Sequence, residues 1–215
     1  MIVDKLIKNI NSWKDNEAII WNGKVYTYGW LRRRIEYYND IIVHYEVEPG
    51  AVVAIIGDYS PNTTALLLSL IKNRNIAVPL TYIVKSNLQE FLKISTTQYI
   101  FKFDENDKFE IVKKEIKKTQ KLLKLLQDQE HSGLILFSSG TTGKPKGIVH
   151  DFENLLSKFL NTNKQFRTLA FLLFDHIAGI DTLFYTLFSG GTLIFPIDRK
   201  PSYICYLIEK FQIEV

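Results

Sequence analysis

Residues 51–57 form an unbroken run of small and β-branched apolar residues, Ala-Val-Val-Ala-Ile-Ile-Gly. A strand that is apolar at every position is buried on both faces of its sheet, which is typical of parallel sheets covered by helices. Short apolar runs recur at 76–80 and 133–137, and segments long enough for helices separate them. This alternation predicts βαβ units and an α/β fold with mostly parallel sheets flanked by helices.

Local signals predict further elements. Asn22-Gly23 lies between two apolar segments and is the strongest short signal for a β-hairpin. Ser60-Pro61 combines a helix N-cap with proline at the first helical position, which predicts a helix to about residue 74. We also expect helices over 30–45, 85–95, 151–161, 178–188 and 201–211, and strands over 98–102, 147–150, 169–174 and 192–195, with a strand beginning at 212–215.

Residues 138–147 have the composition of an anion-binding loop, Ser-Ser-Gly-Thr-Thr-Gly-Lys-Pro-Lys-Gly, and follow the apolar run at 133–137. Glycine lets the backbone adopt positive φ and approach a ligand closely, and successive N–H groups can form a concave anion nest. The hydroxyls and lysines add donors and positive charge, so the pattern indicates a polyphosphate site. A solvated glycine-rich connection is the alternative. The candidate phosphate-binding residues are Ser138, Ser139, Gly140, Thr141, Thr142, Gly143, Lys144, Lys146 and Gly147.

A polar interval separates the two apolar parts of the chain. Residues 104–108 have no apolar side chain, and residues 111–129 contain six lysines. A membrane-surface or anion-binding helix is one interpretation of this basic segment, and a solvated peripheral helix or linker is the favoured one. We therefore expect a first α/β subdomain with an N-terminal hairpin over 1–103, a linker with a basic helix over 104–131, and an incomplete α/β segment with the phosphate loop over 132–215.

Composition excludes several classes of protein. The net charge of +4 is mild, so a nucleic-acid partner is not expected. The one cysteine, Cys205, excludes an internal disulfide and fits a reducing compartment. The N-terminus lacks the features of a signal peptide, and the apolar runs are too short to span a bilayer. We expect a cytoplasmic protein without membrane insertion.

The run at 138–147 resembles the signature phosphate loop of the adenylate-forming superfamily. That superfamily includes acyl- and aryl-CoA synthetases, the adenylation domains of nonribosomal peptide synthetases, and luciferases. Segments 18–31, 47–57, 77–80, 174–179 and 189–193 resemble other parts of the family in the same order, so the resemblance covers nearly the whole chain. It implies the N-terminal part of the adenylate-forming enzyme fold.

The resemblance also implies an activity. In this family ATP and a carboxylic acid give an acyl-adenylate and pyrophosphate, and the acyl group then passes to CoA, a carrier-protein thiol or an amine. Mg²⁺ is implied with ATP, although the sequence shows no complete ligand set for it. A metal site built from His150, Asp151, Asp175 and His176 matches no standard spacing, so none is predicted.

Residues 174–179, Phe-Asp-His-Ile-Ala-Gly, lie where the family's acyl pocket begins. His176 and Gly179 resemble a pattern of acyl- and aryl-CoA ligases, whereas Asp175 resembles the aspartate with which peptide-synthetase domains hold a substrate amino group. The resemblance makes Phe174, Asp175, His176 and Gly179 the candidate substrate-binding residues. The alternative is that Asp175 or His176 caps the following helix.

The chain also departs from the family pattern. Phe152 stands where members often carry a histidine, two residues before the asparagine that corresponds to Asn154. The family's adenine-binding motif, ribose-binding aspartate, hinge and catalytic lysine would all follow Val215. We therefore expect the isolated chain to bind nucleotide phosphate weakly and to turn over little. A non-catalytic nucleotide- or partner-binding module, or half of a split enzyme with a complementing C-terminal half, is the alternative.

Overall fold

The computed structural model describes residues 1–114, 120–139 and 145–215, apart from the side chains of Lys85, Ser86 and Ser139. Its helices are α1 (Ile2–Ser12), α2 (Tyr28–His44), α3 (Pro61–Lys72), the 3₁₀ helix η1 (Tyr82–Asn87), α4 (Leu88–Ile94), α5 (Lys121–Asp128), α6 (Phe152–Ser157), α7 (Ile177–Ser189) and α8 (Pro201–Phe211). Its strands are β1 (Glu17–Trp21), β2 (Lys24–Thr27), β3 (Val52–Ile56), β4 (Ile76–Leu80), β5 (Tyr99–Phe103), β6 (Phe109–Lys113), β7 (Gly133–Ser139), β8 (Pro145–Asp151), β9 (Arg167–Leu169) and β10 (Thr192–Phe195).

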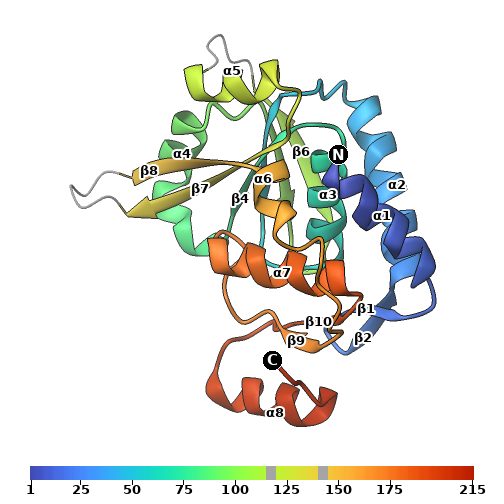
Figure 1. Cartoon of the computed structure of the whole chain (residues 1–215). Coiled ribbons are helices and arrows are strands. Elements are labelled where there is room, and N and C mark those ends of the chain that lie inside the picture. The colour runs from blue at the N-terminus through green and yellow to red at the C-terminus, as the bar shows by residue number, and fades with distance from the viewer. Residues whose placement is uncertain (115–119, 140–144) are drawn as a thin grey trace.

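The strands form two sheets (Figure 1). The six-stranded sheet has the order β6-β5-β3-β4-β7-β8, in which β3 runs parallel to β4 and β5, and β4 runs parallel to β7. Its two edge strands, β6 and β8, pair antiparallel with their neighbours. The four-stranded sheet has the order β2-β1-β10-β9, with only β2 antiparallel. The predicted α/β fold with mostly parallel sheets is confirmed.

Strand β3 is buried on both faces, as its unbroken apolar sequence predicts. Val53 and Ile55 pack in the main core, which also receives side chains from α1, α2, α3 and α7. Val52, Ala54 and Ile56 face a second core beneath α4 and α5. Helices therefore cover both faces of the six-stranded sheet, while α8 packs on the four-stranded sheet (Figure 1).

The local signals at the hairpin and at α3 are confirmed. Asn22 and Gly23 both have positive φ, which the tight turn between β1 and β2 requires. At α3, the Ser60 hydroxyl accepts a hydrogen bond from the Thr63 N–H, and the Thr63 side chain accepts one from the Ser60 N–H. This reciprocal capping box fixes the start of α3 directly after the turn that follows β3.

Two predicted elements are corrected. The helix expected over 111–129 is present only from Lys121, as α5. Its first residues belong to β6 instead, because Phe109 and Ile111 pack against the core while the residues between and after them face solvent. Residues 115–119 of that expected helix lie outside the described residues. The strand expected over 169–174 is β9, which ends at Leu169; the Phe171 N–H donates to the Leu169 carbonyl and turns the chain out of the sheet.

Each sheet takes strands from both sides of the segment 104–131. The six-stranded sheet combines β3, β4 and β5 with β7 and β8, and it also includes β6 from within that segment. The four-stranded sheet combines β1 and β2 with β9 and β10. The last residues extend the four-stranded sheet, since the Glu214 N–H donates to the Arg167 carbonyl and the Leu169 N–H donates to the Val215 carbonyl. The proposed division at 1–103, 104–131 and 132–215 stays a prediction of the sequence.

Helix α1 was not expected from the sequence. It buries Val3, Leu6 and Ile10 and leaves Lys5 and Lys8 exposed, so it is an amphipathic surface helix. Within the described ranges, every helix falls short of the length and apolar character needed to cross a membrane.

Candidate functional site

The β7–β8 hairpin carries the candidate phosphate loop. Its antiparallel ladder continues through the pairs Ser138 with Lys146 and Ser139 with Pro145, and the hairpin projects beyond the body of the six-stranded sheet (Figure 1). Ser138 and Lys146 are both exposed. The other predicted loop residues, Gly140, Thr141, Thr142, Gly143 and Lys144, lie outside the described residues, as does the side chain of Ser139.

Gly147 lies on the face of β8 that is turned toward α4. A Cβ atom there would come within 3.3 Å of Ile135 Cγ2 and 3.4 Å of Phe137 Cε1, both side chains of the neighbouring strand β7. These contacts are tighter than ordinary packing. The structure therefore gives Gly147 a packing role near the loop end of the hairpin, and its predicted part in phosphate binding stays a prediction.

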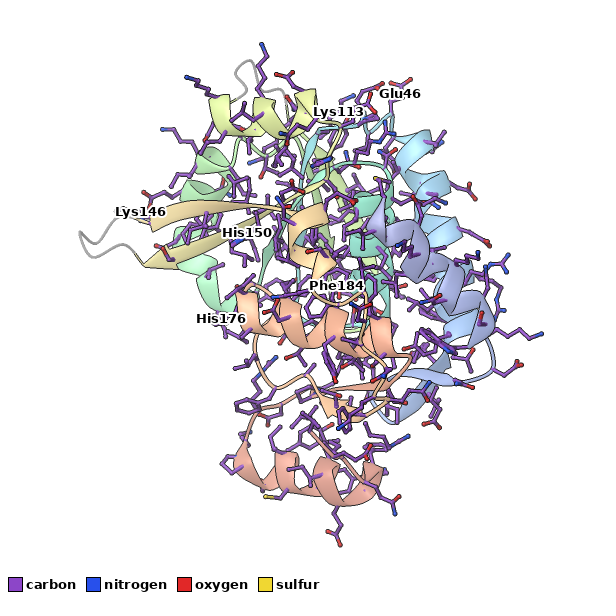
Figure 2. All side chains as sticks on the ribbon, in the orientation of Figure 1. Glu46, Lys113, Lys146, His150, His176 and Phe184 are labelled. Atoms are coloured by element: carbon purple, nitrogen blue, oxygen red, sulfur yellow. The ribbon has the colours of Figure 1, made fainter. Side chains whose placement is uncertain are left out.

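A pocket of about 330 Å³ lies beside the loop end of this hairpin. It brings together Ser138, Asp175 and His176, three of the residues predicted from the sequence. Figure 2 shows His176 below the hairpin that carries Lys146 and His150. The other lining residues come from the hairpin, from η1 and α4, and from the segment before α7: Thr81, Ile83, Val84, Asn87, Phe91, Phe137, Pro145 and Leu173.

The described lining of this pocket is largely apolar. The rings of Phe91 and Phe137 stack with their centroids 4.1 Å apart and their planes 5° from parallel. Among the described lining residues, Asp175 supplies the one carboxylate. An apolar wall with few polar groups is the usual composition of a small-molecule site. The wall from η1 and α4 was missed, since nothing in the sequence of 82–91 marks it as part of a site.

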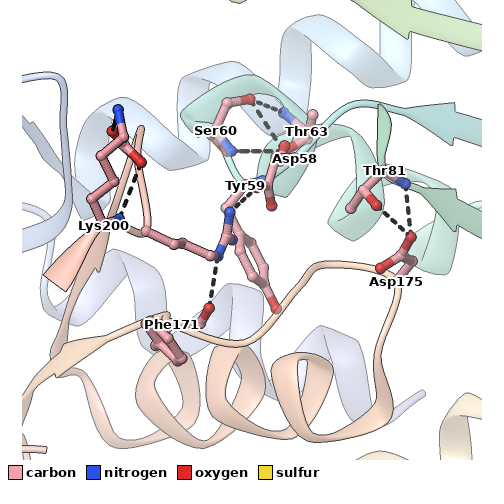
Figure 3. Close-up of polar contacts among 10 residues, drawn as sticks. Asp58, Tyr59, Ser60, Thr63, Thr81, Phe171, Asp175 and Lys200 are labelled. Carbon is pink, nitrogen blue, oxygen red and sulfur yellow. Dashed lines mark hydrogen bonds and ion pairs between the residues drawn. The ribbon is translucent and has the colours of Figure 1, made fainter. Parts of the chain in front are cut away.

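Asp175 does not cap the helix that follows it. Its Oδ2 accepts two hydrogen bonds from Thr81, one from the backbone N–H at 2.9 Å and one from the hydroxyl at 2.7 Å (Figure 3). Thr81 is the first residue after β4 and is 3% exposed. The position of Thr81 at the carboxyl end of a parallel strand is the one signal that could have marked it.

His176 is the N-cap of α7. Its Nδ1 accepts a hydrogen bond of 3.2 Å from the Ala178 N–H, so in this geometry Nε2 carries the ring proton. The helix-capping alternative is therefore confirmed for His176 and not for Asp175. Because His176 is also exposed at the pocket, a role in binding substrate stays a prediction.

Phe174 and Gly179 lie behind the pocket and do not line it. Phe174 is fully buried, with its ring edge-on to Tyr59 at 5.0 Å between centroids. A Cβ atom on Gly179 would stand 2.2 Å from the Leu173 carbonyl oxygen and 2.7 Å from the Tyr59 hydroxyl. Both residues thus hold the segment 173–176 against its neighbours, and their predicted contact with substrate stays untested.

His150 and Asp151, the histidine and the carboxylate of β8, are partly buried and interact with neighbouring parts of the fold. Burial lowers the pKa of His150 below its ordinary value. Asp151 caps α6 by accepting from the Glu153 N–H and pairs with His131 Nδ1 at 2.9 Å. Across residues 1–114, 120–139 and 145–215, no three His, Cys, Asp or Glu residues are grouped to hold a metal ion.

A model of the family "AMP-binding enzyme" matches residues 6–215. Among curated proteins, N-benzoylphenylalaninol synthetase apmA of Penicillium brevicompactum is 37% identical over 80 residues, which are 34% of this chain and 3% of that protein. The chain thus spans a small fraction of the curated relatives that it matches.

Two solved structures show the same fold. The N-terminal subdomain of Klebsiella oxytoca NpsA, in complex with 3-hydroxyanthranilyl-AMSN, has a TM-score of 0.75 at 18% identity and matches over 99% of this chain and 57% of that one. o-Succinylbenzoate CoA synthetase (MenE) of Bacillus subtilis, in complex with the acyl-adenylate intermediate OSB-AMP, has a TM-score of 0.77 at 17% identity, over 98% and 60% of the two chains. At these identities the likeness concerns the fold.

Proposed function

Because the chain belongs to the AMP-binding enzyme family, we propose that it is the N-terminal portion of an ATP-dependent carboxylate-activating ligase. One observation carries this proposal: a single pocket is lined by Ser138, at the start of the phosphate-loop sequence, and by Asp175 and His176. The segment expected to bind phosphate and the segment expected to bind the acid thus border the same space.

In the proposed reaction, a carboxylate oxygen of the acid attacks the α-phosphorus of ATP. The bond from that phosphorus to the bridging oxygen of pyrophosphate breaks, and the acyl-adenylate and pyrophosphate form. Catalysis is then mainly positioning, together with neutralisation of charge on the phosphates. A bound Mg²⁺ would supply part of that neutralisation. A later transfer to CoA or to a carrier-protein thiol would give a thioester.

We assign the phosphates to the loop at 138–147. Thr141, Thr142 and the loop N–H groups would hold the β- and γ-phosphates, and Lys144 and Lys146 would offset their charge. Hydrogen bonds to charged groups contribute about 1.5–3 kcal/mol each, so several of them could anchor a triphosphate. The exposed position of Lys146 at the loop end of the hairpin supports this assignment, because its ammonium group is accessible to a ligand.

Amino-acid adenylation is the second candidate, and Asp175 favours it. A carboxylate that is half-buried in a pocket with apolar walls can pair with a substrate ammonium group. An acyl or aryl acid without an ammonium group would leave this carboxylate without a counter-charge. The two candidates share the adenylation step and differ only in what Asp175 contacts.

Calorimetric titration of the 215-residue chain with MgATP tests the proposed function. We expect weak binding that is lost in Lys144→Ala and Lys146→Ala and kept in Lys24→Ala, an exposed lysine of β2. We also expect little carboxylate-dependent pyrophosphate exchange by the isolated chain. Binding that both loop variants retain would overturn the assignment of the phosphates. Robust exchange would overturn the expectation that this portion turns over little.

A further inference from the structure

Thr81 and Asp175 are 94 residues apart in the sequence and meet at the wall of the pocket (Figure 3). Thr81 directly follows β4 of the six-stranded sheet, and Asp175 lies in the connection between β9 of the four-stranded sheet and α7. Both residues line the pocket of about 330 Å³. The contact therefore joins the end of β4 to the connection that leads from the other sheet into α7, at the candidate site.

The geometry restricts the Asp175 carboxylate to one orientation. Both donors of Thr81 are directed to the same oxygen, Oδ2, at 2.9 Å and 2.7 Å. Hydrogen bonds to an ionised acceptor are about twice as strong as neutral ones, and two donors from one buried residue leave the carboxylate little freedom to rotate. Among the described residues no donor reaches Oδ1. Thr81 thus holds one oxygen, and within the described part of the chain the other makes no hydrogen bond.

Thr81 also begins η1, the 3₁₀ helix that supplies Ile83, Val84 and Asn87 to the pocket wall. The same residue therefore contacts the carboxylate and precedes the helix that supplies apolar residues to the pocket wall. A rigid negative charge beside an apolar surface is complementary to a ligand with an ammonium group and an apolar body.

We propose that Thr81 is a positioning residue, which holds the Asp175 carboxylate so that the pocket prefers carboxylate substrates with an ammonium group. The proposal rests on the proposed function, because it assigns the acid-binding part of that site. The competing interpretation is that the contact between Thr81 and Asp175 only stabilises the fold. The two interpretations predict different selectivity, because a contact that only stabilises the fold would affect binding of every ligand of the pocket equally.

The experiment compares two probes on the 215-residue chain without nucleotide. L-Phenylalanine carries the ammonium group, and 3-phenylpropanoate is its analogue without it. Their dissociation constants are measured by NMR titration for wild type, Thr81→Val, which removes the hydroxyl at nearly constant shape, and Thr81→Ser, which keeps it. Thr186→Val is the matched control, since Thr186 is also buried but donates its hydroxyl to the Thr182 carbonyl inside α7.

We expect wild type to bind L-phenylalanine more tightly than 3-phenylpropanoate. Thr81→Val should weaken binding of L-phenylalanine about tenfold, the effect of losing one hydrogen bond to a charged group, and leave 3-phenylpropanoate unchanged. Thr81→Ser should restore the preference, and Thr186→Val should keep it. The inference would be overturned if Thr81→Val weakened binding of both probes equally, or if Thr81→Ser did not restore the preference. It would also be overturned if wild type bound neither probe or bound both with equal affinity. MgATP binding is measured separately, so that failure of the proposed function can be distinguished from failure of the inference about Thr81.

Discussion

The rings of Phe91 and Phe137 stack face to face, with centroids 4.1 Å apart, and join α4 to the strand that leads into the phosphate-loop sequence. Phe91 is 6% exposed and belongs to the second core, against which Phe137 packs. Both rings also line the pocket. The packing of the second core and the shape of the candidate site therefore depend on the same pair of side chains.

Phe91→Ala should destabilise the fold. Removing a buried phenylalanine costs about 3–5 kcal/mol, the sum of lost burial and of the cavity that is left. Urea denaturation followed by circular dichroism measures the change. Phe171→Ala is the control, because Phe171 is exposed, and it should change stability by less than about 0.5 kcal/mol. A loss of similar size in both variants would contradict the role given to the stacked pair.

Gly179→Ala should destabilise the protein although alanine is the better helix former. In an exposed helix this substitution stabilises by about 1 kcal/mol, but here the new Cβ would stand 2.2 Å from the Leu173 carbonyl oxygen. We expect a loss of about 1–3 kcal/mol from overpacking, measured by urea denaturation. A neutral or stabilising result would show that Gly179 of α7 is not closely packed against the segment 173–176.

Asp107 should make stability depend on pH. Burial, opposed by hydrogen bonds from Ser60 and the Asn62 N–H, raises the pKa of Asp107 from 3.8 to about 6. The folded protein therefore holds this proton more tightly than the unfolded chain does. The resulting stabilisation is complete below pH 3.8 and is lost as the pH rises through about 6.

Urea denaturation between these pH values measures the effect, and Asp107→Asn should remove this part of the slope because asparagine does not ionise. Asp104→Asn is the control, since Asp104 is exposed in the same turn. A slope that Asp107→Asn leaves unchanged would assign the pH dependence to other groups.

Elements whose signals lie in adjacent residues of the sequence could be predicted. The unbroken apolar run of β3 predicts burial on two faces, and Ser60-Pro61 predicts the start of α3. The run at 169–174 misleads, because Phe171 and Leu172 are apolar but exposed in the structure, where the chain has left the sheet. Strand β6 was not predicted, because the lysine-rich residues that follow it favoured a helix. The alternation of Phe109 and Ile111 with polar residues, which is typical of a strand, was too short to indicate otherwise.

The candidate site follows from the sequence only in part. The composition of 138–147 predicts an anion site, whereas 174–179 is a candidate only through its resemblance to the family. The contact of Thr81 with Asp175 cannot be read from either segment, since it arises only when β4 and the start of α7 are brought together by the two sheets. The apolar wall of Phe91 and Phe137 is also a tertiary feature, because each residue alone has the pattern of an ordinary core side chain.

The most direct test of the central claim is a titration of the isotope-labelled chain with MgATP, followed by backbone-amide chemical shifts. We expect the largest shift changes at residues 138–147 and smaller ones at the pocket residues Thr81 and Asp175. The cavity of about 700 Å³ between α1 and residues 157–165, lined in part by Lys5 and Lys8, is the internal comparison. Shifts concentrated there, or no shift at 138–147 at saturating nucleotide, would contradict the account.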